Sequence, residues 1–242
     1  MTKLPMTVLG LLVLVTPVAA DGGMPFKAAI AQREPTAAET VDAANGDSLL
    51  QNQFLDWLWG RGGHPPGAGR GEPLITRGGF CVVVPATNEG VMETWSDRPV
   101  FVTNIGHGGL EVISQADSEL IWSHLPTQES FVRYEGQPLQ RGETYIARIS
   151  NPLLSRSAPR EIRFKVLAET QAIEQDLEQL EAELIAAGET VESLVLKRAD
   201  YFWEQGLIAD AWRELVTIQS VSPTAAMAVD SGLTRLCNLN EE

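Results

Sequence analysis

The chain has 242 residues, 44% hydrophobic and 21% charged, a composition typical of a mostly globular protein rather than a disordered or multi-span membrane protein. Its 32 acidic side chains outnumber 18 Lys and Arg side chains, so the formal net charge is −14. This excess argues against a surface for nucleic acid or anionic lipid, because such partners are bound by positive charge.

The N-terminus has the outline of a secretory signal peptide. Lys3 supplies a positive charge, residues 4–20 are apolar, and Val18-Ala19-Ala20 provides small side chains for cleavage before Asp21. Cleavage before Gln32 is an alternative. An uncleaved membrane anchor is another, although an anchor needs about 20 apolar residues. Cleavage would leave no integral membrane span, and we therefore expect a periplasmic or secreted protein of the cell envelope.

The next two segments are predicted to contain little regular structure. Residues 21–46 lack a sustained apolar period and are predicted to be a disordered spacer. Residues 47–78 contain a short helix that begins with Asp47 or Ser48 as its N-cap and ends at Gly60, followed by a Gly/Pro-rich linker. We expect this helix to fold back onto its own domain, with docking on a partner or a membrane surface as the alternative.

Export favours a disulfide between the two cysteines. Cys81 and Cys237 are too far apart in the sequence for a Cys-x-x-Cys redox or zinc motif, and no metal site is predicted. In an oxidising compartment their bridge would close a loop of about 157 residues. Two buried free thiols are the alternative.

Residues 79–167 are predicted to form a β-sandwich. Short apolar and β-branched runs alternate there with turn signals, as in all-β sandwiches. The predicted strands cover residues 80–84, 100–105, 110–115, 119–123, 130–134, 144–150 and 161–167.

One turn in this region carries a resemblance. Leu139, Gly142 and Tyr145 form a Leu-x-x-Gly-x-x-Tyr pattern. It resembles the corner of fibronectin type III and related immunoglobulin-like domains, where the Tyr hydroxyl bonds to the upstream backbone. The resemblance implies an immunoglobulin-like antiparallel sandwich with Tyr145 in the matching place, and it implies no chemistry.

Residues 168–242 are predicted to form a helical segment, because the apolar period changes from two to 3.6. We expect an acidic helix over residues 169–187, a second helix capped by Thr190, and a last helix over residues 224–236. The predicted fold class is therefore α+β: an immunoglobulin-like antiparallel β-sandwich followed by a C-terminal α-helical segment.

Part of this segment resembles one tetratricopeptide repeat, whose helices need small residues where they cross. The residues that carry the resemblance are Ala199, Phe202, Gly206, Ala211, Leu215 and Pro223. Val195, Arg198 and Ile218 depart from the repeat's preferences. A single unit is too small to bury a core, so we expect it to pack on the rest of the protein.

No catalytic constellation or cofactor motif is recognised in the sequence. The Gly-rich segment around His107 is similar to an oxyanion-hole loop, yet the Gly-x-Ser-x-Gly nucleophile motif is absent from the sequence. The candidate binding surface consists of Trp95, Asp97, Arg98 and His107. Trp57 and Trp59, beside the linker, are expected to be exposed.

The order of these parts resembles a group of exported cyanobacterial proteins that carry a domain of unknown function. The resemblance is carried by Thr76-Arg77-Gly78-Gly79-Phe80-Cys81, by Trp95-Ser96-Asp97-Arg98-Pro99-Val100-Phe101, and by the corner at Tyr145. It implies an envelope protein of no established activity.

The sequence favours a non-enzymatic adaptor, in which the sandwich and the helices bind a protein partner of the cell envelope. A hydrolase of envelope polymer, using carboxylates that the fold brings together, is the enzymatic alternative. A protein that binds small ligands or cations is suggested by the acidity alone, and no calcium-loop spacing is present.

Overall fold

The computed structural model describes residues 52–61, 74–75, 80–85, 90–154 and 157–238. The predicted signal peptide, the predicted spacer and most of the predicted Gly/Pro-rich linker lie outside the described residues. Every described residue belongs to a single compact unit, Ala44–Glu242.

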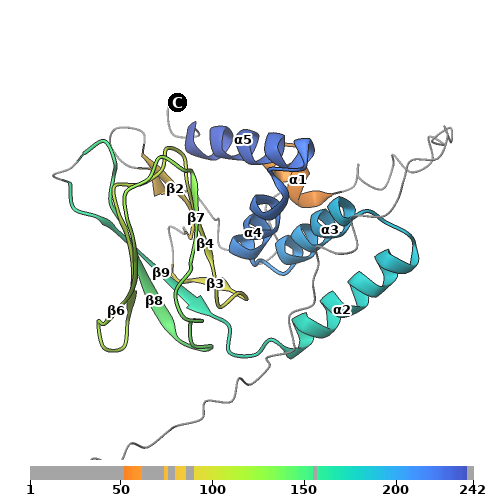
Figure 1. Ribbon diagram of the computed structural model, residues 1–242, viewed down its shortest axis with the longest axis horizontal. Coiled ribbons are helices and arrows are strands. Elements are labelled where there is room, and N and C mark those ends of the chain that lie inside the picture. The colour runs from red at the N-terminus through yellow and green to blue at the C-terminus, as the bar shows by residue number, and fades with distance from the viewer. Residues whose placement is uncertain (1–51, 62–73, 76–79, 86–89, 155–156, 239–242) are drawn as a thin grey trace, which may run out of the picture. The chain divides into compact units, whose positions relative to one another are not determined.

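Two sheets form the β part of the protein (Figure 1). One has the strand order β1 (Leu74–Ile75), β2 (Cys81–Val84), β4 (Val100–Thr103), β7 (Phe131–Arg133). The other has the order β3 (Met92–Thr94), β9 (Arg160–Val166), β8 (Thr144–Ile149), β5 (Leu110–Ser114), β6 (Leu120–His124). All neighbouring strands are antiparallel except β3 and β9, which are parallel.

All seven predicted strands are present, each within two residues of its expected bounds. Strands β1 and β3 were not predicted, because two or three residues are too few to show an alternating pattern. The α+β class is confirmed at the level of two mostly antiparallel sheets followed by helices.

The helices are α1 (Gln53–Leu58), α2 (Gln171–Ala186), α3 (Val191–Glu204), α4 (Ile208–Ile218) and α5 (Pro223–Asn238). Thr190 caps α3 as predicted, since its hydroxyl accepts the Ser193 N–H at 3.1 Å. The N-cap predicted for the first helix was wrong. The cap is Asn52, whose side-chain oxygen accepts the Leu55 N–H at 2.8 Å.

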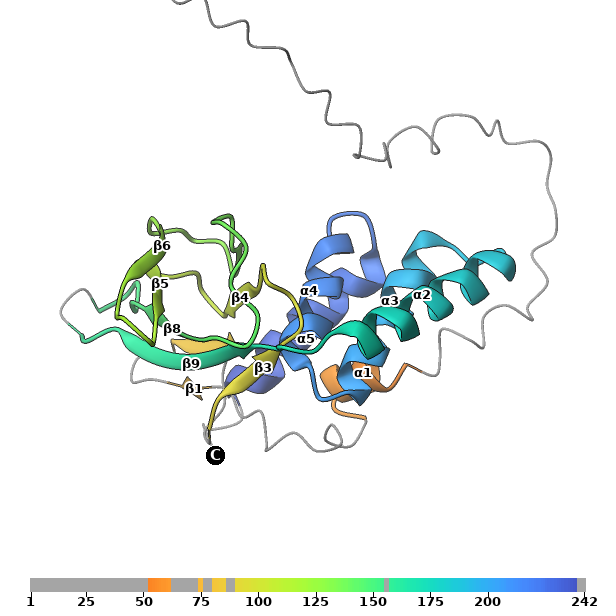
Figure 2. The same ribbon diagram turned by 90° about the horizontal axis from the view of Figure 1, so that it is seen from below.

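The helices pack against β2 and β4 of the four-stranded sheet, and α4 also contacts β3 of the other sheet (Figures 1 and 2). Along β4, Phe101 packs into the core between the sheets, while Val100 and Val102 pack into the core shared with the helices. Both faces of this strand are therefore buried, which explains its continuous apolar sequence.

The predicted corner forms in the core between the sheets. The Tyr145 hydroxyl accepts the Gln140 backbone N–H at 2.8 Å, and Gly142 makes the turn with a φ of +83° that favours glycine. The hydroxyl thus holds the β7–β8 connection against the start of β8.

The first helix folds back onto the other helices, as expected. The Trp57 ring centroid lies 4.4 Å from that of Trp203, and Phe54 lies 5.3 Å from the same ring. Trp57 is consequently buried, so its predicted exposure was wrong, whereas Trp59 is half-buried. Helix α5 approaches closely at Gly232, where a Cβ would lie 2.6 Å from Leu58 Cδ2.

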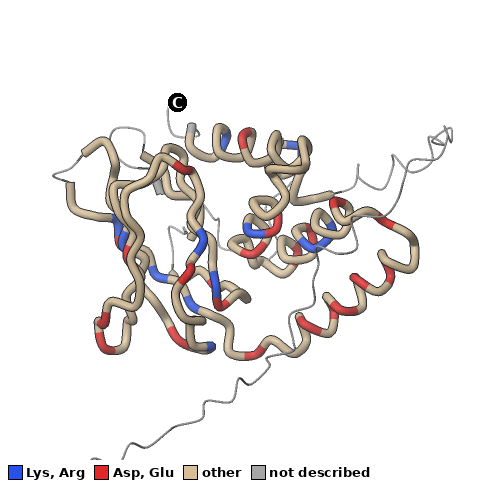
Figure 3. Tube along the Cα trace, viewed as in Figure 1, with Lys and Arg blue, Asp and Glu red and all other residues tan. Residues whose placement is uncertain are grey.

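The helical part is joined covalently to the sheets. Cys81 in β2 and Cys237 in α5 form a disulfide with a Cα–Cα distance of 5.7 Å. The predicted bridge is confirmed, and with it the prediction that the helical segment folds back across the sandwich. Helix α2 carries its acidic side chains on a mostly exposed surface, with Leu177 as its buried residue (Figure 3).

Candidate functional site

A buried aspartate of α4 holds the chain that connects β3 to β4. Asp210 is fully buried and accepts the backbone N–H groups of Trp95 at 2.7 Å and Ser96 at 3.0 Å. The Thr94 hydroxyl donates to the same carboxylate at 3.1 Å. Burial raises the pKa of Asp210, while the nearby Arg213 and these hydrogen bonds act in the opposite direction. The connection is therefore fixed to a helix more than 100 residues away in the sequence.

Arg213, one turn further along α4, completes this attachment. Its Nη1 donates to Ser96 Oγ at 3.1 Å, and its guanidinium lies 5.2 Å from the centroid of the Trp95 ring. Ser96 Oγ also accepts the Arg98 backbone N–H at 3.1 Å. These contacts fix the backbone from which the Arg98 side chain extends.

Arg98 lines a pocket between the four-stranded sheet and helices α3 and α4, which we call the arginine pocket. Its volume is about 440 Å³. It is lined by Arg98, Val100, Arg133, Tyr134, Glu135, Arg198, Arg213, Glu214 and Thr217. Four Arg and two Glu give the lining a formal charge of +2, opposite in sign to the −14 of the chain.

The helical wall of the pocket is organised around one carboxylate oxygen. Glu214 is buried, and its Oε1 accepts from Arg213 Nη2 at 2.8 Å and from Arg198 Nη2 at 3.2 Å. Glu181 of α2 also accepts from Arg198. Two guanidiniums are thus brought together on the side of the pocket that α3 and α4 provide.

The strand wall carries arginines with fewer partners. Arg133 reaches α4 only through long contacts, 3.4 Å to Thr217 Oγ1 and 3.5 Å to the Val216 carbonyl oxygen. Neither Arg98 nor Arg133 forms an ion pair within the part of the chain that the structure describes. Both are exposed, so their guanidiniums are available to a ligand.

The structure brings only some of the predicted surface residues together. Arg98 lines the arginine pocket. Trp95 is outside the lining, and its ring packs against the guanidinium of the lining residue Arg213. Asp97 is half-buried in the same connection, where its carbonyl oxygen accepts the Leu139 N–H at 3.0 Å.

His107 lies apart from the pocket lining, in the loop between β4 and β5. It is buried, and its ring centroid is 5.3 Å from that of His124. Its Nδ1 accepts the Gly109 N–H at 3.1 Å. Burial, together with the neighbouring His124, lowers the pKa of His107 to about 4.

Sequence reasoning missed Arg133, Arg198 and Arg213 as site residues. One of them did leave a signal, because Arg198 stands where the tetratricopeptide pattern prefers Leu. An arginine at a position expected to pack against a neighbouring helix can mark a buried polar site.

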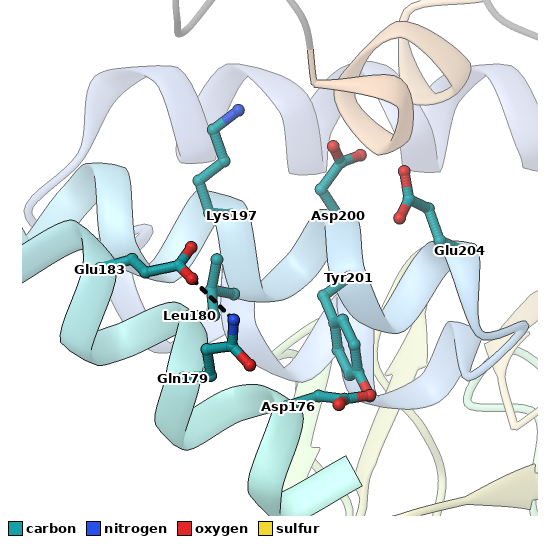
Figure 4. A pocket seen from close by; sticks show the side chains of 8 residues that line it. All are labelled: Asp176, Gln179, Leu180, Glu183, Lys197, Asp200, Tyr201 and Glu204. Atoms are coloured by element: carbon teal, nitrogen blue, oxygen red, sulfur yellow. Dashed lines mark hydrogen bonds between the residues drawn. The ribbon is translucent and has the colours of Figure 1, made fainter. Parts of the chain in front are cut away.

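A second pocket, the acidic groove, lies between α2 and α3 (Figure 4). Its volume is about 360 Å³, and its lining consists of Asp176, Gln179, Leu180, Glu183, Lys197, Asp200, Tyr201 and Glu204. Four acids and one Lys give a formal charge of −3. Figure 4 shows Asp200 and Glu204 pointing toward α1, while Tyr201 and Asp176 face each other.

The carboxylates of the acidic groove take part in contacts between helices. Tyr201 donates its hydroxyl proton to Asp176 at 2.9 Å, and Asp200 accepts the Phe54 N–H of α1 at 2.9 Å. The Gln53 amide donates to Glu204 at 3.0 Å. Burial raises the pKa of Asp200, an effect that the hydrogen bond from Phe54 opposes. These groups attach α1 and α2 to α3.

Neither a family model nor a curated protein matches the chain. Within the described ranges, no three or more His, Cys, Asp or Glu side chains are grouped so that they could hold a metal ion. None of the helices described here is long and apolar enough to cross a membrane.

Proposed function

We propose that this protein is a non-enzymatic exported adaptor that binds an acidic group of a protein partner in the arginine pocket. The observation that carries the proposal is a lining of net charge +2 on a chain of net charge −14. A basic pocket on an acidic protein attracts an individual acidic group, while the surrounding negative charge repels extended polyanions.

Further observations support the export and architecture included in this proposal. A disulfide that joins distant segments is typical of an oxidising compartment, and the N-terminal sequence has the outline of a signal peptide. The Tyr145 hydroxyl bond and the burial of Ala211 in α4 are in keeping with an immunoglobulin-like sandwich and a tetratricopeptide-like helix pair. The proposal therefore includes the immunoglobulin-like sandwich, the tetratricopeptide-like helix pair and membership of the exported cyanobacterial group.

The hydrolase alternative would need carboxylates that are available for acid–base chemistry. In the acidic groove, Asp176 and Asp200 instead accept hydrogen bonds that attach one helix to another. The adaptor proposal therefore places binding in the other pocket, where the arginines of the strand wall have few partners.

The adaptor role is tested by capture on the immobilised protein from the envelope or secreted fraction of the source cell. The pocket variant is Arg98→Glu with Arg133→Glu. The matched control is Arg160→Glu with Arg163→Glu on β9, which makes the same charge change at exposed positions outside the pocket lining. We expect the wild type and the control to retain the same partner, and the pocket variant to lose it.

Two results would contradict the adaptor role. One is capture of the same partner by the pocket variant. The other is the absence of any protein retained above background by the wild type. Intact-mass measurement of the exported protein tests the localisation separately, because we expect a mature chain beginning at Asp21, or alternatively at Gln32.

A further inference from the structure

The arginine pocket contains more hydrogen-bond donors than acceptors. Arg198 and Arg213 share one oxygen of Glu214, and Arg198 has one further carboxylate partner in α2. Even so, the Nε–H groups of both arginines are buried without a hydrogen-bond partner among the described residues. Because most buried polar groups in proteins are paired, these two donors add to the excess of hydrogen-bond donors over acceptors on the helical wall.

The charge of the lining indicates which class of anion the pocket would favour. The lining is +2, Glu181 outside the lining pairs with Arg198, and the two arginines of the strand wall have no ion pair in the described parts of the chain. A carboxylate offers a single charge and two oxygens in a plane. A phosphate monoester carries about −1.5 to −2 charges at pH 7 and offers three terminal oxygens, which several guanidiniums can share.

From the acceptor deficit and the charge of the lining, we infer that the arginine pocket binds a single phosphate group, either inorganic phosphate or the terminal phosphate of a monoester. In its monoester form this inference rests on the proposed function, since it names the acidic group of the partner that the pocket would recognise. Arg98 and Arg133 contact the phosphate from the strand side, while Arg198 and Arg213 supply donors from the helices. A volume of about 440 Å³ is large enough for a small group attached to the phosphate.

Titration calorimetry on the protein with its disulfide intact tests this inference. The ligands are inorganic phosphate, phenyl phosphate and acetate, each at the same ionic strength. We expect phosphate to bind about tenfold or more tightly than acetate, because it offers twice the charge and more acceptors. Equal binding of phenyl phosphate would identify a monoester as an acceptable source, whereas binding of inorganic phosphate alone would identify free phosphate; both results support the site.

Matched variants assign the binding to the pocket. Arg98→Gln with Arg133→Gln should weaken phosphate binding by about tenfold or more, and Arg160→Gln with Arg163→Gln should leave it within about twofold. The single variant Arg98→Gln distinguishes a loss of phosphate binding from a loss of folding. The Arg98 side chain makes no hydrogen bond or ion pair in the described structure, so its replacement should leave the fold intact. We expect it to weaken binding at an unchanged unfolding temperature.

The inference is overturned if phosphate gives no saturable heat, or if the pocket variants bind it as the wild type does. Such a failure is distinct from failure of the adaptor role. Partner capture that is lost in the pocket variant without phosphate binding would refute only the choice of phosphate. Phosphate binding without any captured partner would refute only the adaptor role.

Discussion

The arginine pocket and the acidic groove differ in how their charged groups are used, although α3 contributes to both. In the groove, Asp176 and Asp200 each accept a hydrogen bond from a neighbouring element, and the charge has the same sign as that of the chain. In the pocket, Arg198 and Arg213 have buried Nε–H groups with no acceptor in the described part of the chain, and the charge has the opposite sign. The groove's charges thus hold helices together, whereas Arg98 and Arg133 in the pocket have no ion pair among the described residues.

The largest expected effect comes from the disulfide, because it joins the two parts whose surfaces form the pocket. Cys237→Ser should lower the free energy of unfolding by about 5 kcal/mol, as loss of a bridge spanning 156 positions frees the unfolded chain. Chemical denaturation measures the change. Secondary structure should be largely retained, and reduction of the wild type should give the same loss. An unchanged midpoint would show that the bridge contributes nothing to the attachment.

Asp210→Ala tests the framework of the pocket. The change leaves the Trp95 and Ser96 N–H groups and the Thr94 hydroxyl without their buried acceptor, so we expect a loss of about 3–5 kcal/mol of stability. Urea unfolding measures the loss, and phosphate binding should weaken with it because Arg98 is displaced. Wild-type stability would show that Asp210 does not hold the β3–β4 connection.

His107 provides a third polar region for comparison, a buried base outside both pocket linings. Its folded pKa of about 4 lies below the usual 6.5, so between these pH values the unfolded chain binds the extra proton. Above pH 6.5 the protonation of His107 does not reduce the free energy of unfolding. As the pH falls from 6.5 toward 4, the free energy of unfolding decreases by on the order of 3 kcal/mol because the unfolded chain takes up this proton.

The variant His107→Gln isolates this contribution, because the carboxylates titrate equally in both proteins. Urea unfolding measured across that pH range should show a steeper loss of stability on acidification for the wild type than for the variant. Parallel curves for the two proteins would contradict the burial of a neutral imidazole.

The smallest effect is expected in the acidic groove. Asp200→Ala removes the acceptor of the Phe54 N–H at the start of α1, which should cost about 1–2 kcal/mol, a value typical for loss of a helix cap. Thermal unfolding measures the change. Phosphate binding should be unaffected, because the groove is separate from the arginine pocket. If Asp200→Ala lowered stability as much as Asp210→Ala does, the two buried aspartates would be equally important for the fold, contrary to this prediction.

Features with a local signature could be predicted from the sequence. The strands followed from alternating and β-branched runs, the cap of α3 from Thr190, and the corner from Tyr145. The bridge between Cys81 and Cys237 followed from the expected compartment and the count of cysteines.

The arginine pocket could not be predicted, because it depends on which surfaces pack together. Its residues come from the β3–β4 connection, the β7 region and two helices, and Asp210 sets their relative position from more than 100 residues away. The same packing explains the error at Trp57, which lies beside a Gly-rich segment yet is covered by Trp203. Of the residues predicted for the binding surface, Arg98 lines the arginine pocket, whereas His107 lies in another loop outside it.

The most direct test of the distinction between the two pockets is an NMR titration of the arginine Nε–H groups with inorganic phosphate. We expect the Nε–H resonances of Arg198 and Arg213 to shift saturably, because the added acceptor rearranges the hydrogen bonds of both guanidiniums. The backbone resonances of Asp200 and Tyr201 in the acidic groove should keep their positions. If the Arg198 and Arg213 resonances do not change at saturating phosphate, the arginine pocket is not a phosphate site.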